Sequence, residues 1–187
     1  MFVISSTSVA ALLAFFSVAA AKPLAPAEPL TPAQLNAQSL TEGWTVYSNQ
    51  TLDNGSILTL WNPPALEARD TSGLSKRCGS NRIECNDSHQ PKSGPCSSLR
   101  EQIYLNRGNT LPATPRALCL SQGSDQCCVS WANLLHANTP WATLINANDA
   151  LQFDCVNKGK SGRALDVNLS DVCTTQCMSN RAEGCKN

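Results

Sequence analysis

Cysteine supplies most of the reactive chemistry of this 187-residue chain, which contains ten cysteines and two histidines. All ten cysteines follow residue 77, where they make up about a tenth of the residues, a density typical of disulfide scaffolds. The even number predicts five bridges, although spacing alone does not fix their pairing. The residues involved are Cys78, Cys85, Cys96, Cys119, Cys127, Cys128, Cys155, Cys173, Cys177 and Cys185.

Two cysteines are adjacent, in the stretch Asp125-Gln-Cys-Cys-Val-Ser-Trp131. Neighbouring side chains of a β-strand point to opposite faces of the sheet. In a strand, Cys127 and Cys128 would therefore bond to partners on two faces, one toward the helices and one toward the other face or a terminal arm. Trp131 shares a face with Cys127 and is expected to pack toward the helices; the opposite facing is the alternative.

A zinc site is the alternative use of the pair Cys173-x-x-x-Cys177. It would need a second pair of ligands with similar spacing, and an oxidising compartment works against free thiolates. We therefore expect no metal and no other cofactor.

The compartment follows from the first residues of the chain. Residues 9–21 form an apolar run with the length of a signal-peptide core, too short to span a bilayer. The small residues Ala19 and Ala21 suit signal peptidase, so we expect residues 1–21 to be removed. No second apolar run exists, which predicts a secreted, extracellular protein without a membrane span.

The cysteine-rich segment begins directly after a dibasic pair, Lys76-Arg77. Such a pair is a cleavage site for Kexin-type secretory proteases, and the polar, glycine-containing residues before it favour access. This predicts a pro-region at 22–77 and a mature domain at 78–187. The alternative is an uncut dibasic pair within a linker.

The pro-region contains two β-like runs, residues 43–47 and 56–61, around the turn Asp53-Asn-Gly55. An isolated hairpin is marginally stable in water, so this one is expected to pair with the cysteine-rich domain. It would assist folding or mask a surface before cleavage. The alternative is a retained hairpin that extends the sheet.

Four Asn-x-Ser/Thr tripeptides are candidate glycosylation sites, and two of them lie on each side of the dibasic pair. The residues around Asn54 and Asn86 resemble turns. Asn168 would escape modification if it lies in a strand. The four acceptors are Asn49, Asn54, Asn86 and Asn168.

The cysteine-rich segment alternates strand-like and helix-like runs in the order β-α-β-β-α-β, followed by a short helix. This predicts an α+β fold, a small disulfide-rich α/β sandwich with an antiparallel sheet in split β-α-β order. Predicted strands are 81–85, 116–120, 127–131 and 163–169; predicted helices are 97–106, 139–151 with Thr139 as cap and Pro140 in its first turn, and 170–178.

The cysteine-rich part resembles a family of small secreted fungal proteins labelled "WD-like". The resemblance covers about residues 78–187 and depends on Gln126-Cys-Cys-Val-Ser-Trp131, Ser161-Gly162, residues 173–181 and the closing Gly184-Cys185. It implies fungal origin and secretion and brings no established activity. The chain has no internal repeat, so no propeller is expected. In fold class and cysteine density it is also similar to α/β-sandwich killer toxins.

No catalytic constellation stands out. A Ser-His-Asp arrangement would use Ser130, His136 and either Asp149 or Asp154, but Ser130 lacks a nucleophile elbow. Paired carboxylates could be Glu84 with Asp87 or Asp166 with Asp171, and Lys158–Gly162 lacks full phosphate-loop spacing. We therefore expect no enzyme.

Three functions remain open. The first is a secreted binding, effector-like or toxin-like protein acting on a host or competitor cell. The second is a structural or carbohydrate-binding wall protein using exposed Trp141 or Tyr104, and the third is a small hydrolase. After residue 77, ten Lys and Arg oppose nine Asp and Glu, which argues against nucleic-acid binding. We expect a monomer with an extracellular target on a cell surface or wall glycan.

Overall fold

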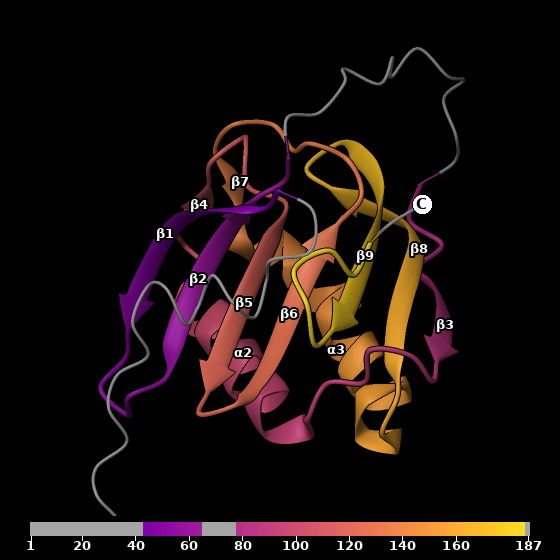
Figure 1. Cartoon of the computed structure of the whole chain (residues 1–187). Coiled ribbons are helices and arrows are strands. Elements are labelled where there is room, and N and C mark those ends of the chain that lie inside the picture. Colours follow the sequence, from indigo (N-terminus) through magenta and orange to yellow (C-terminus); the bar gives the residue numbers. More distant parts are fainter. Residues whose placement is uncertain (1–42, 65–77, 186–187) are drawn as a thin grey trace, which may run out of the picture.

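The computed structural model describes residues 43–64 and 78–185, which fold as an open antiparallel sheet with two helices on one face (Figure 1). This confirms the predicted α+β class, and the described strands form no propeller. The expected signal peptide, its cut after Ala21, and the Lys76-Arg77 pair lie outside the described residues.

Seven strands form the sheet in the order β1-β2-β5-β6-β9-β8-β3. Their bounds are β1 Thr45–Thr51, β2 Ile57–Asn62, β3 Arg82–Asn86, β5 Ala117–Gln122, β6 Asp125–Trp131, β8 Ser161–Leu169 and β9 Val172–Ser179. The helices are α2 (Ser93–Leu105) and α3 (Ile145–Asp154), with 3-10 turns at Trp141–Leu144 and Val156–Lys158. Strands β4 (Thr110–Leu111) and β7 (Thr139–Pro140) pair separately.

The hairpin β1–β2 belongs to the main sheet, because β2 lies between β1 and β5. Its register with β5 runs from Ile57 opposite Ser121 to Trp61 opposite Ala117. Ile57 and Trp61 are buried there. The prediction that the hairpin pairs with the cysteine-rich part is therefore confirmed, and the sheet is continuous from β1 to β3.

The main core lies between the sheet and the helices. Leu99 and Ile103 of α2 and Leu151 of α3 are fully buried against the sheet residues of this face. Trp131 lies in the same core, which confirms its predicted facing. The buried residues of α2 are apolar and recur at helical spacing, whereas α3 buries Asn148 and Gln152 beside Ala147 and Leu151.

The predicted start of α3 is wrong. Thr139 does not cap the helix: its hydroxyl donates to the carbonyl of His136 at 2.8 Å, and Thr139–Pro140 pairs with β4. The chain then makes the 3-10 turn at Trp141–Leu144 before α3 begins at Ile145. The threonine hydroxyl thus closes the preceding turn instead of meeting the helix amides.

The helix predicted for residues 170–178 is also wrong, because this segment is strand β9, inserted between β6 and β8. Cys173 and Cys177 are four residues apart, a spacing that places two side chains on one face in a helix and in a strand alike. The β-branched residues Val172, Thr174 and Thr175 favour the strand.

The hairpin should contribute strongly to stability through Trp61, which is 2% exposed. We expect Trp61→Ala to lower the free energy of unfolding by about 3–5 kcal/mol, the usual cost of truncating a buried aromatic residue. Denaturant unfolding of the full chain measures this. The control is Tyr47→Ala on the exposed side of the hairpin, expected to stay within about 0.5 kcal/mol of the parent. Equal effects would contradict the packing described.

Candidate functional site

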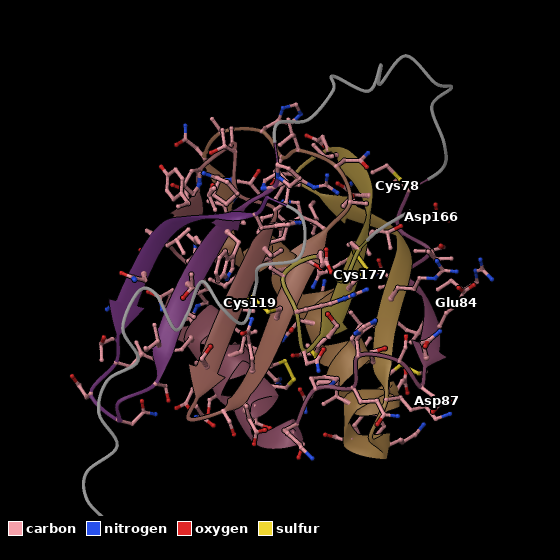
Figure 2. All side chains as sticks on the ribbon, in the orientation of Figure 1. Cys78, Glu84, Asp87, Cys119, Asp166 and Cys177 are labelled. Carbon is pink, nitrogen blue, oxygen red and sulfur yellow. A yellow bond between two sulfur atoms is a disulfide. The ribbon has the colours of Figure 1, made fainter. Side chains whose placement is uncertain are left out.

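The disulfides connect every layer of the molecule (Figure 2). Cys127 bonds to Cys96 of α2 on the helix side, and Cys128 bonds to Cys119 of β5. Cys119 and Cys128 lie directly opposite each other in the β5–β6 ladder. The prediction that the adjacent cysteines serve the two faces of one strand is therefore confirmed.

Two further bridges attach edge strand β3 and the C-terminal segment to the rest of the molecule. Cys85 of edge strand β3 bonds to Cys155 after α3, and Cys177 of β9 bonds to Cys185. The structure thus contains four of the five expected bridges. Cys78 and Cys173 are half-buried and lie outside them. The Cys78 thiol donates to the carbonyl of Asp166 at 3.5 Å.

The sheet face opposite the helices is covered in part by residues 182–185. Ala182 packs with Trp61 and the Cys119–Cys128 bridge in a second apolar cluster. Gly184 lies so close to Ser179 and Ser130 that a Cβ atom there would clash with the Ser179 hydroxyl. This close approach explains the glycine before Cys185.

The Ser-His-Asp arrangement considered above does not assemble. Ser130 is 1% exposed on this covered face, and its hydroxyl has no hydrogen-bond partner. His136 is exposed in the loop before β7, and Asp149 lies on α3, on the other face of the sheet. The serine therefore contacts no general base within the described residues.

The candidate carboxylates are engaged elsewhere. Glu84 lies 2.8 Å from Arg82 and 2.8 Å from Arg163, and Asp87 lies 3.2 Å from Lys160. Asp166 sits in the β8 bulge, where Ser80 is 3.5 Å from its carboxylate. Each of these acids has its own polar neighbours instead of facing a partner acid across a cleft.

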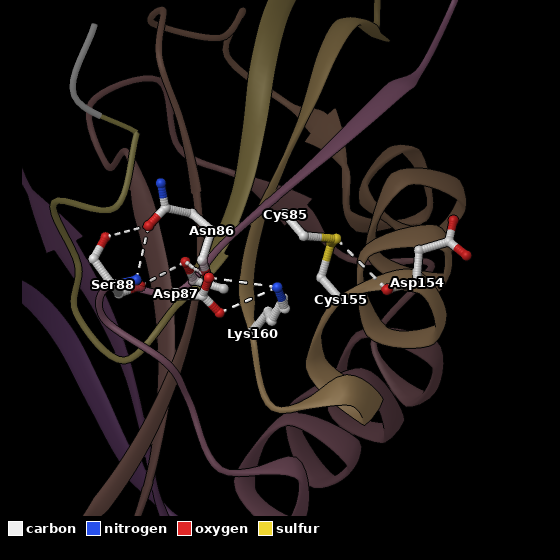
Figure 3. Close-up of polar contacts among 8 residues, drawn as sticks. Cys85, Asn86, Asp87, Ser88, Asp154, Cys155 and Lys160 are labelled. Atoms are coloured by element: carbon white, nitrogen blue, oxygen red, sulfur yellow. Dashed lines mark hydrogen bonds and ion pairs between the residues drawn. A yellow bond between two sulfur atoms is a disulfide. The ribbon is translucent and has the colours of Figure 1, made fainter.

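The segment Lys158–Gly162 is fixed by its neighbours rather than open for a phosphate (Figure 3). One of its two lysines, Lys160, forms an ion pair with Asp87, as Figure 3 shows. The Ser161 hydroxyl donates to the carbonyls of Asn86 and Ser88, at 3.2 and 2.7 Å. These contacts tie the start of β8 to the end of β3.

A polar cluster that sequence reasoning missed joins the outer sides of α2 and α3. Arg100 Nε donates to Asp149 at 2.6 Å, and the Tyr104 hydroxyl donates to the other carboxylate oxygen at 2.5 Å. The Arg100 guanidinium also lies 4.8 Å from the Tyr104 ring centroid. Asp149 is more than forty positions from Arg100 and Tyr104 in sequence, so no local pattern reveals its contact with them.

Hydrogen bonding to Asp149 raises the pKa of Tyr104 above its ordinary value, and the same hydrogen bonding raises the pKa of Arg100. For tyrosine, a raised pKa means that the folded state favours the neutral, donating hydroxyl. Its contribution to stability is present below the unfolded pKa and is lost as the pH rises through the folded pKa.

The two aromatic residues considered for sugar binding, Trp141 and Tyr104, offer little to a sugar. Trp141 is 7% exposed, and the Tyr104 hydroxyl is occupied by Asp149. A hollow of about 240 Å³ lies beside the β5–β6 turn, and its lining is polar and contains no aromatic ring. It is lined by Gln90, Lys92, Ser124, Asp125, Gln126 and Asn180.

Neither described segment contains a group of three or more metal-ligating side chains. No helix of residues 43–64 and 78–185 is long and apolar enough to cross a membrane. The four sequon asparagines are all exposed. Asn168 lies near the end of strand β8, and a strand is the location considered for it from the sequence.

Gly162 allows β8 to approach the Cys85–Cys155 bridge. A Cβ atom there would lie 2.7 Å from Cys155 Sγ and 2.9 Å from a Leu151 methyl group. Gly162→Ala should therefore reduce the free energy of unfolding by about 1–3 kcal/mol through overpacking. Thermal unfolding measures this, with Gly108→Ala as control, because a Cβ atom there meets nothing within 4 Å. Comparable stability of the two variants would contradict this close packing.

The Tyr104–Asp149 contact predicts a shifted titration. In a Tyr47→Phe background, Tyr104 is the remaining tyrosine, so ultraviolet absorbance reports on it alone. We expect a midpoint above about 10, the ordinary pKa of tyrosine. Adding Asp149→Asn removes the charged acceptor and should lower the midpoint. An unchanged midpoint in that variant would show that Asp149 does not hold the hydroxyl.

Comparison with known proteins gives a match between this chain and one protein family. The family model described as "Fungal WD-like" matches residues 45–185, which includes the β1–β2 hairpin as well as the cysteine-rich segment. No curated protein and no solved structure matches the chain. With most of its length matched, this disulfide-stabilised α+β protein belongs to the fungal WD-like family.

Proposed function

We propose that this protein is secreted and acts outside the cell by binding a target, as an effector-like or toxin-like protein. The observation that carries this proposal is the set of four disulfides connecting the sheet, both helical regions and the C-terminal segment. Such bonds form and persist in oxidising compartments. The apolar run at residues 9–21 is consistent with this route.

The outer side of the helices is the surface we assign to target binding. Phe153 is 74% exposed and lies one helical turn after Asp149 on α3. It is the most exposed of the large apolar side chains in the described segments. An aromatic residue beside the charged groups Arg100 and Asp149 has the composition of a protein-binding hot spot.

Proteolytic cleavage of the chain is compatible with this proposal, provided that the β1–β2 hairpin stays bound afterwards. A cut after Arg77 would separate the β1–β2 hairpin from residues 78–187, and no disulfide involves a residue before 78. The hairpin would then be held by its ladder to β5 and by buried residues such as Trp61. We propose that it stays bound after cleavage, as a second chain of the active protein.

The wall-binding alternative has weaker support because Trp141 is buried and Tyr104 is engaged. The hydrolase alternative has weaker support because Ser130 is covered and contacts no base. Both stay open to direct tests with insoluble chitin or glucan and with a substrate panel.

The test uses the protein secreted by a fungal host from the full-length gene. Oxidised protein is applied to fungal, yeast and plant cells over a concentration series, beside a reduced and alkylated sample. We expect growth inhibition, cell death or saturable surface binding from the oxidised sample alone.

The variant Phe153→Ala should weaken the effect at least tenfold, whereas Leu134→Ala, an exposed apolar residue in the loop after β6, should not. Retention of the chain inside the host, or absence of binding to every cell type, would overturn the proposal. Binding to chitin or glucan in place of cells would favour the wall-binding alternative.

A further inference from the structure

Among the described residues, strands β1 and β3 form the two edges of the main sheet (Figure 1). An edge strand presents unpaired backbone N–H and C=O groups, which can pair with another chain. Proteins protect such edges with charges, bulges or covering groups. The two edges of this sheet differ in how they are protected.

Edge strand β3 has charged protection. Glu84 in its centre lies between Arg82 on the same strand and Arg163 on β8, each at 2.8 Å. The Lys160–Asp87 pair follows at the end of the strand. A second strand would have to desolvate these charges in order to pair with β3.

Edge strand β1, Thr45–Thr51, contains no charged residue and no proline. Its residues are exposed or half-buried, and they include the β-forming residues threonine, valine and tyrosine. The formal net charge of the chain is zero, so long-range repulsion between copies is weak. A shift of register between Val46 and Ser48 gives β1 a bulge near its start, so bulge protection is confined to that end of the strand and residues 48–51 pair regularly with β2.

Sequons lie on both edges. Asn49 of Asn49-Gln-Thr51 is exposed on β1, and Asn86 of Asn86-Asp-Ser88 is exposed at the end of β3. The Asn86 side-chain oxygen accepts hydrogen bonds from the Ser88 amide and hydroxyl, both at 2.7 Å. Figure 3 shows the Asn86 side-chain nitrogen pointing away from these contacts. A group attached to this nitrogen would meet no hydrogen-bond partner of the asparagine.

We propose that Asn49 and Asn86 are glycosylated and that the glycan at Asn49 prevents β1 from pairing with β1 of a second copy. The proposal rests on the secretion proposed above. Each Asn Nδ2 forms a bond to the anomeric carbon of a lipid-diphosphate-linked oligosaccharide. The bond from that carbon to the diphosphate oxygen breaks, the lipid diphosphate leaves, and the amide loses one proton to water.

The occupant of the uncharged β1 edge is a second copy of the chain. Two identical antiparallel edges related by a two-fold axis extend the sheet across a closed dimer interface. The charges on β3 disfavour the same contact at the other edge. Loss of the Asn49 glycan should therefore cause dimerisation, whereas loss of the Asn86 glycan should leave the chain monomeric.

The test compares full-length secreted protein with Thr51→Ala, which destroys the Asn49 sequon, and Thr51→Ser, which keeps it. Peptide mapping before and after enzymatic removal of N-glycans identifies the modified asparagines. Light scattering after gel filtration gives the mass of the protein part. We expect Thr51→Ala to lose the Asn49 glycan and double in mass, and Thr51→Ser and Asn86→Gln to stay monomeric.

Edge pairing is tested separately on oxidised protein made without glycosylation, so it does not depend on secretion. This protein should be dimeric, and Gln50→Lys on β1 should return it to a monomer by placing a charge on the edge. A monomeric unglycosylated protein, or an unmodified Asn49 or Asn86 in secreted material, would overturn the inference. Neither result would bear on target binding through the helices, which the cell assay measures.

Discussion

The structure depends on one constraint, the opposite direction of two successive side chains in β6. Because Cys127 faces α2 and Cys128 faces away from the helices, a single strand is bonded covalently to a helix and to its neighbour β5. The Cys85–Cys155 bridge joins edge strand β3 to the end of α3, and the Cys177–Cys185 bridge holds the C-terminal segment. A domain of this size buries a limited core, and these bonds supplement it.

Much of this architecture was predictable because the signals are local. The turn Asp53-Asn-Gly55, the alternating faces of β6 and the apolar stripe of α2 each lie within a few neighbouring residues. The errors arose where one spacing fits two structures. Cys173 and Cys177 share a face in a helix and in a strand, and only the position of β9 between β6 and β8 decides between them. The misplaced start of α3 has a similar cause, because a threonine hydroxyl can cap a helix or close a turn.

The candidate surface was less predictable than the fold. Arg100, Tyr104 and Asp149 come from two helices, and their contact depends on how these helices pack on the sheet. Ser130 and His136, by contrast, are close in sequence but differ in environment, since one is covered and the other exposed. Proximity in sequence misleads here because alternate residues of a strand serve different faces.

Strands β2 and β5 pair with each other but are synthesised at different times, because they lie far apart in the sequence. Ile57 of β2 is made well before its partner Ser121 of β5. At translation rates of roughly 5–20 residues per second, about 3–13 s pass before β5 is complete. During that interval the apolar side of the hairpin has no sheet to cover it. The hairpin can therefore complete its pairing with the sheet only after β5 has been made, so the first-made part of the sheet is among the last to be paired.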